Sequence, residues 1–178
     1  MTSGAPTRRR ARPPARAAPT VVRVIGCGNP DAGDDAVGLL AGRALRRRLG
    51  ARPGVEIVET AAGVQVLDLL GCTHTVVVVD AVHTAGHRQP GTPVRVEAGP
   101  DGLPAELSGS VSTHGIGVAD AIGLGAVLGR LPPTVFLGIE VADVRPGAML
   151  SLEVAGGLPA LVDMIEAEVL ARLETWRS

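Results

Sequence analysis

The segment TVVVVD, residues 75–80, carries the strongest structural signal in this chain. Its unbroken run of β-branched residues is typical of a central parallel strand that is covered on both faces. The segments VVRVIG at 21–26 and TVFLGIEV at 134–141 indicate two more buried strands. Further strands are expected at 55–59 and at 93–97, and the alternating pattern of the latter places it near an edge of the sheet.

Segments with helical periodicity alternate with these strands. Apolar residues recur at helical spacing between Val37 and Leu49, a short helix is expected at 64–70, another at 114–128, and a last one from about Leu158. Such alternation predicts helices packed on a mostly parallel sheet. We therefore expect an α/β fold, a single-domain three-layer sandwich with a twisted, mostly parallel sheet and helices on both faces.

The length of 178 residues suits one domain, since domains commonly have roughly 100–200 residues. Residues 1–20 are rich in Arg, Pro and Ala, a composition that cannot bury a core. We interpret them as a disordered N-terminal tail and residues 21–178 as the single α/β domain.

Composition argues against several classes of protein. Five of the 17 basic residues lie in the tail, which leaves 12 Arg against 18 acidic residues, a formal charge of −6, in the rest of the chain. With one Trp, one Phe and no Tyr, the chain lacks the stacking aromatics of single-strand nucleic-acid binders. No apolar run approaches the roughly 18 residues of a membrane span, and no apolar export segment follows the basic tail. We predict no nucleic-acid partner, no membrane association and a cytoplasmic location.

Candidate site residues follow from the rule that ligands of open α/β sheets bind at the carboxyl ends of the strands. Asp35 follows the first strand, Asp80 ends the valine run, and His114 precedes a helix. A carboxylate at the end of a buried strand must be solvated, paired or bound to a metal. Two carboxylates and an imidazole suit a divalent transition metal such as zinc or nickel, with open positions left over.

Plainer interpretations stay open for the acidic and histidine residues. Asp34 and Asp35 can be acids that complement the start of the following helix. His83 and His87 are read as ordinary surface residues, although His83 is close enough to Asp80 in sequence to compete for the same site. Structural roles are favoured for Glu140 and Asp143, near the end of the last strand.

Two rival motifs are weak. The Gly26-x-Gly28 pair opens like a dinucleotide fingerprint, but the position of its third glycine is occupied by Asp31. Cys27 is read as a small buried hydrophobe rather than a nucleophile, and two cysteines in a chain of this length do not indicate a disulfide framework.

Five segments together resemble the hydrogenase maturation endopeptidases, the proteases that finish the large subunit of nickel–iron hydrogenases. They occur in the family's order, and the first carries the signature G-N-x-x-x-x-D-[DE]-x-x-G. The segments are VIGCGNPDAGDDAVG at 24–38, VETAAGVQVLDLL at 58–70, VVVVDAV at 76–82, STHGIGVADAI at 112–122 and VFLGIEVAD at 135–143.

The resemblance implies a fold and a function. The family's two metal-contacting carboxylates match Asp35 and Asp80, and its histidine matches His114, so the resemblance implies that these three are both catalytic residues and metal ligands. It implies a peptidase domain over 21–178 that removes a C-terminal peptide from the large-subunit precursor. Nickel would arrive with that precursor, and other divalent metals would substitute for it in vitro.

Departures and alternatives accompany this implied function. Ala36 stands where the family usually has Gly, and Thr60, Ala61 and Ala62 replace the usual G-G-T residues, which concerns how the substrate approaches. A non-cleaving, nickel-sensing assembly factor for the same precursor is the main alternative, and a nucleotide-binding domain ranks lower. Scarce aromatic side chains, the usual anchors of tight interfaces, favour a transient encounter with the precursor, and we expect the chain to be a monomer.

Overall fold

A computed structural model describes residues 20–61, 63–71, 73–84, 88–104, 107 and 116–177. The predicted N-terminal tail lies outside these residues, except for Thr20. Five strands form one sheet in the order β2-β1-β3-β5-β4. The strands are β1 (Val22–Cys27), β2 (Val55–Thr60), β3 (Thr75–Val82), β4 (Pro93–Glu97) and β5 (Thr134–Glu140).

Three of the four strand pairings are parallel, and only β4 runs antiparallel, at the edge beside β5. The expectation of a mostly parallel sheet with 93–97 near an edge is therefore confirmed. All eight residues of β3 are buried, which agrees with a central strand covered on both faces. Because β3 continues to Val82, Asp80 lies within the strand rather than at its end.

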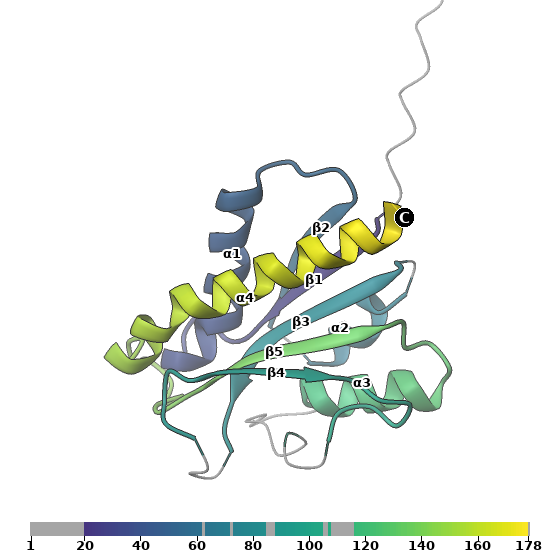
Figure 1. The fold of residues 1–178 in the computed structure, drawn as a ribbon. Helices are drawn as coiled ribbons and strands as arrows, with labels where there is room; N and C mark the ends of the chain where they lie inside the picture. The colour runs from purple at the N-terminus through teal and green to yellow at the C-terminus, as the bar shows by residue number, and fades with distance from the viewer. Residues whose placement is uncertain are drawn as a thin grey trace, which may run out of the picture.

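Helices cover both faces of the sheet (Figure 1). The helices are α1 (Val37–Leu49), α2 (Gly63–Leu69), α3 (Val118–Val127) and α4 (Leu152–Arg177), and a short 3-10 helix, η1 (Gly33–Ala36), precedes α1. Residues of α1 and α4 share one core with the sheet, and residues of α2 and α3 share the other. The predicted three-layer α/β sandwich is confirmed.

The valine run serves both cores because side chains of a strand alternate between its faces. Val77 and Val79 point into the core beneath α1 and α4. Val76, Val78 and Val82 point into the core beneath α2 and α3. The same alternation places Asp80 on the α2/α3 face.

Two helix boundaries differ from the sequence expectation. Helix α4 begins at Leu152 rather than near Leu158, and Pro159 lies inside it. Ser151 explains the earlier start, since its Oγ accepts a hydrogen bond from the amide of Val154, 3.3 Å away, as an N-cap residue does. Helix α3 begins at Val118, and residues 114–115 of the predicted helix lie outside the described residues.

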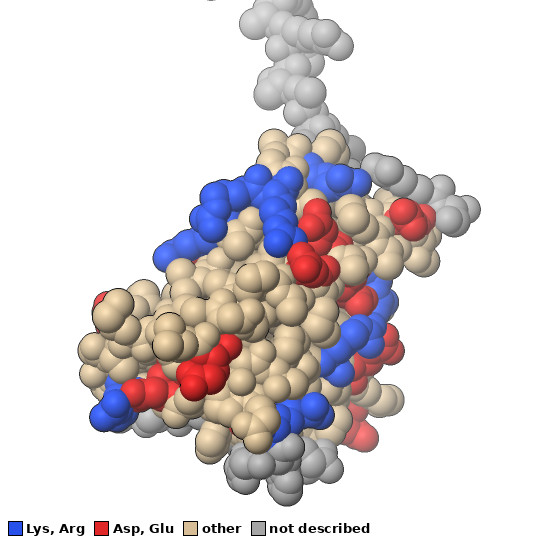
Figure 2. Space-filling model, turned by 60° about the vertical axis from the view of Figure 1, so that its left-hand side comes forward, with Lys and Arg blue, Asp and Glu red and all other residues tan. Residues whose placement is uncertain are grey.

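The surface is of mixed charge. On the face in Figure 2, basic and acidic side chains lie beside one another in clusters that uncharged surface separates. Arg43 and Arg46, for example, both pair with Glu59. Among the described residues, no helix has the length and apolar character needed to cross a membrane.

Candidate active site

The candidate site lies where β1 and β3 separate. The chain leaves β1 toward β2 on one side and returns to β3 on the other, and such a switch of direction opens a crevice at the carboxyl ends of the strands. Pairing between β1 and β3 stops at Gly26 and Val79. Asp35 in η1 and Asp80 in β3 therefore belong to the two walls of this opening.

Asp35 is placed by a tight loop between β1 and α1. One of its carboxylate oxygens accepts a hydrogen bond from the amide of Asn29, 3.0 Å away. Gly28 makes the loop possible, because its φ is 138° and a Cβ there would lie 1.8 Å from the carbonyl oxygen of Asp35. Partial burial raises the pKa of Asp35, and the hydrogen bond from Asn29 opposes that rise.

Asp80 is a buried carboxylate with an exposed fraction of 8%. Burial raises its pKa to about 7, and the nearby negative charge of Asp35 adds to the rise, while a hydrogen bond from the amide of Ala81 opposes it. The two acids are therefore close enough to repel each other. Among the ion pairs of the described residues, none involves Asp35 or Asp80.

Cys27 lies beside the two acids and is 2% exposed. Burial raises the pKa of its thiol well above the usual range, and the charges of Asp80 and Asp35 raise it further. A thiol held in its neutral form is a poor nucleophile. Its place in the core beneath α2 and α3 agrees with the interpretation of Cys27 as a small buried hydrophobe.

Asp34 has a role entirely different from that of its neighbour Asp35. It is fully buried, and its carboxylate accepts hydrogen bonds from the amides of Ala142 and Asp143 after β5. It also accepts from the amide and the hydroxyl of Ser151, at 2.7 and 3.0 Å. Asp34 thus fastens both ends of the 142–151 segment to the loop that carries Asp35, so it complements a distant segment rather than the start of its own helix.

The remaining sequence candidates divide into three groups. His114 and His87 lie outside the described residues. Asp143 pairs with Arg145, whose hydrogen bonds lower the pKa of Asp143 to about 2. Glu140 is buried and His83 lies 3.6 Å from it, by the distance between Nδ1 and Oε1.

Because His114 lies outside the described residues, only two of the three predicted metal ligands, Asp35 and Asp80, are described. Within the described part of the chain, no group of three or more His, Cys, Asp or Glu side chains could hold a metal ion. Sequence reasoning also missed Gly38, where a Cβ would lie 2.2 Å from the carbonyl oxygen of Cys27 and 2.4 Å from that of Val79. This glycine lets the start of α1 touch the ends of both strands, and its place in the quoted signature was the available signal.

Comparisons with known proteins agree with this fold. A family model described as hydrogenase maturation protease matches residues 40–168. The hydrogenase maturating endopeptidase HybD from Escherichia coli superposes with a TM-score of 0.72 at 23% identity, covering 85% of this chain and 93% of that one. The [NiFe] hydrogenase maturation protease HybD from Thermococcus kodakarensis superposes with a TM-score of 0.62 at 26% identity, covering 83% and 97%. A comparison with curated protein sequences gave no match.

Fold and family together define an α/β endopeptidase, an enzyme that hydrolyses peptide bonds. The chain belongs to the hydrogenase maturation protease family, whose model covers well over half of it. The resemblance stated from the sequence motifs is thereby confirmed.

Proposed function

We propose that this peptidase removes a C-terminal peptide from the nickel-loaded large-subunit precursor of a nickel–iron hydrogenase. Family membership supports a maturation substrate, and the Thermococcus protein, similar in fold and 26% identical, is a [NiFe] hydrogenase maturation protease. Nickel is part of the substrate in this proposal, because the precursor brings it to the enzyme.

The observation that carries the proposal is the pair formed by Asp35 and Asp80. Both carboxylates are partly or fully removed from water, they repel each other, and no ion pair of the described residues neutralises either one. Burying an unpaired charge is costly, so a cation supplied from outside would relieve the site. Carboxylate oxygens fit divalent metals, and an imidazole from His114 would add the nitrogen ligand that suits nickel or zinc.

The described residues supply proton chemistry and positioning. Nickel on the precursor would polarise the scissile carbonyl or lower the pKa of a water molecule. Asp80, with a pKa raised to about 7, can hold a proton near neutral pH and give it up when a cation arrives. Asp35 faces the same opening on a loop that Asn29 and Gly28 hold in one conformation.

The test incubates a purified nickel-loaded precursor with the wild type and with Asp80→Asn, Asp35→Asn and His114→Ala, and measures the intact mass of the precursor. Loss of the C-terminal mass with the wild type and the control Asp31→Asn, but not with the three site variants, supports the proposal. Asp31→Asn is the matched control, because Asp31 is an exposed acid in the same loop. Undiminished cleavage by Asp80→Asn and His114→Ala would contradict the assignment.

A stable complex between the wild type and the precursor without loss of mass would instead support the non-cleaving assembly factor. The monomeric state and the cytoplasmic location stay predictions from the sequence.

A further inference from the structure

The segment of β3 that carries Asp80 is supported on one side only. Pairing with β1 ends at Val79, whereas pairing with β5 continues through Asp80 and Ala81 to the last pair, Val82 with Glu140. The position of Asp80 in the crevice therefore depends on how firmly the end of β3 is attached to the end of β5.

Glu140 provides that attachment with its side chain. The carboxylate is 2% exposed, and it accepts two hydrogen bonds from Thr84, one from the amide and one from the hydroxyl, both 2.8 Å long. Hydrogen bonds to a charged acceptor in a buried setting are stronger than neutral ones, and two donors on one residue fix its orientation. Thr84 follows β3 by two residues, so this contact holds the strand just beyond Asp80.

The backbone of Glu140 also holds the far end of the link between β3 and β4, near Gly91 and Thr92. Gly91 donates its amide to the carbonyl of Glu140, and Glu140 donates its own amide to the carbonyl of Thr92. The next residue, Val141, donates to the carbonyl of Val82, 2.9 Å away. Both described ends of the link from β3 to β4 are thus tied to the last residues of β5.

An alternative view is that Glu140 serves stability alone. A buried carboxylate loses its hydration, and an apolar side chain of similar size often stabilises the folded state as well or better. A hydrogen-bonded charge gains instead a single defined geometry. A defined geometry matters most where a reactive carboxylate lies nearby on the same face of the sheet. Asp80 is such a carboxylate, because it lies on the neighbouring strand β3, two residues before Val82, which pairs with Glu140.

We propose that Glu140 is a positioning residue of the peptidase site, which acts through Thr84 to hold the end of β3 and with it the carboxylate of Asp80. The proposal rests on the function proposed above, in which Asp80 contacts the reacting group. Glu140 itself does not touch the substrate.

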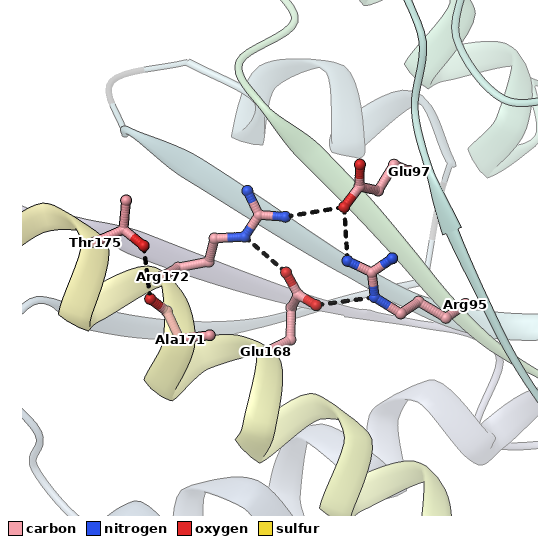
Figure 3. Close-up of polar contacts among 6 residues, drawn as sticks. All are labelled: Arg95, Glu97, Glu168, Ala171, Arg172 and Thr175. Carbon is pink, nitrogen blue, oxygen red and sulfur yellow. Dashed lines mark hydrogen bonds and ion pairs between the residues drawn. The ribbon is translucent and has the colours of Figure 1, made fainter.

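The structure offers a matched control in Glu168 on α4 (Figure 3). Its side chain is 11% exposed and accepts hydrogen bonds from Arg95 and Arg172. Arg95, Glu97, Glu168 and Arg172 form an ion-pair cluster between β4 and α4. In the sheet, Arg95 lies opposite Leu137 in the middle of β5 and Glu97 lies opposite Val135, so this cluster lies away from the carboxyl ends of the strands. Glu168→Ala therefore removes a partly buried, doubly bonded carboxylate without touching the attachment of β3.

The experiment measures kcat and KM for cleavage of the nickel-loaded precursor, at a temperature well below the unfolding of every variant. Glu140→Ala is expected to lower kcat at least about tenfold while KM changes less than about twofold, because small misplacements of reacting groups are costly. Glu140→Gln keeps an acceptor for Thr84 and is expected to stay within about threefold of the wild type. Glu168→Ala is expected to keep the full kcat.

Equal kcat values for Glu140→Ala and Glu168→Ala, in an assay where the wild type cleaves, would overturn the positioning role and leave the proposed function intact. Absence of cleavage by the wild type would overturn both. Should Glu140→Ala fail to fold, Thr84→Val replaces it, since valine keeps the amide donor and removes the hydroxyl donor. A reduced kcat for Thr84→Val supports the proposal, and an unchanged kcat contradicts it.

Discussion

The pKa values of acidic side chains shift in opposite directions in two regions of the molecule, the crevice between β1 and β3 and the ion-pair cluster between β4 and α4. In the cluster, burial alone would raise the pKa of Glu168, but hydrogen bonds from Arg95 and Arg172 outweigh that effect and lower it. In the crevice, burial and mutual repulsion raise the pKa of Asp80, and no ion pair of the described residues counteracts them. The chain is rich in Arg, but none of the described Arg side chains forms an ion pair with Asp80. This difference supports the proposal that a cation carried by the substrate enters the crevice.

The largest expected effect concerns Asp35. Asp35→Asn keeps the size of the side chain and removes the charge that faces Asp80, so cleavage of the nickel-loaded precursor should fall by about 10²–10⁴-fold, the usual range for a group that acts in proton transfer. Glu168→Gln, which removes an acid from the cluster, should leave cleavage within about twofold. Initial rates of cleavage, followed by the intact mass of the precursor, measure both variants. Equal rates for Asp35→Asn and Glu168→Gln would contradict the different roles of the two regions.

The next effect is on stability and separates the buried acid Asp34 from an exposed acid, Asp31, in the same loop. Asp34→Ala leaves buried donors of Ala142, Asp143 and Ser151 without their acceptor, and should lower the free energy of unfolding by about 3 kcal/mol or more. Exposed Asp31, in the same loop, should cost less than about 0.5 kcal/mol when changed to Ala. Urea denaturation at neutral pH measures the difference. A small effect of Asp34→Ala would show that the 142–151 segment is held by other contacts.

A third prediction uses the pH dependence of stability. Folded Asp80 keeps its proton up to about pH 7, whereas an unfolded Asp loses it near pH 4. The native state therefore binds more protons between these values, and the contribution of Asp80 to stability falls as the pH rises through this window. Asp80→Asn removes the loss and should be more stable than the wild type at pH 8, by up to about 4 kcal/mol.

The advantage of Asp80→Asn should become small near pH 4, where unfolded Asp is about half protonated, and should disappear below about pH 3, where wild-type Asp80 is protonated in both states. Thermal unfolding at pH 4, 6 and 8 follows the change, and Asp68→Asn, at an exposed position of α2, serves as the control. A stabilisation independent of pH would mean that desolvation of the Asp80 charge is not its cause.

The smallest effect is expected in the ion-pair cluster. Glu97 is 61% exposed and pairs with Arg95 and Arg172, and exposed pairs contribute only about 0.2–1 kcal/mol. Glu97→Gln should cost no more than this, and the cost should shrink with added salt because ions screen exposed charges. Unfolding at low and high salt measures it; a larger, salt-independent cost would mean that the cluster is a buried network.

Much of this arrangement could be predicted from the sequence. The valine run predicted the central strand, and the rule that sites form at the carboxyl ends of strands brought Asp35 and Asp80 to one opening. The different roles of Asp34 and Asp35 could not be predicted, because they depend on contacts with residues more than 100 positions away. The hydrogen bonds from Thr84 to Glu140 could not be predicted either, because they join residues 56 positions apart. The early start of α4 depends on Ser151 as a cap.

The most direct test of the account is the nickel dependence of cleavage. The wild type is incubated with two samples of the same large-subunit precursor, one loaded with nickel and one without, and the intact mass of each is followed with time. The account predicts loss of a C-terminal peptide from the nickel-loaded sample and an unchanged mass for the nickel-free one. Cleavage of both samples at the same rate would contradict the claim that the acids at the crevice await a cation carried by the substrate.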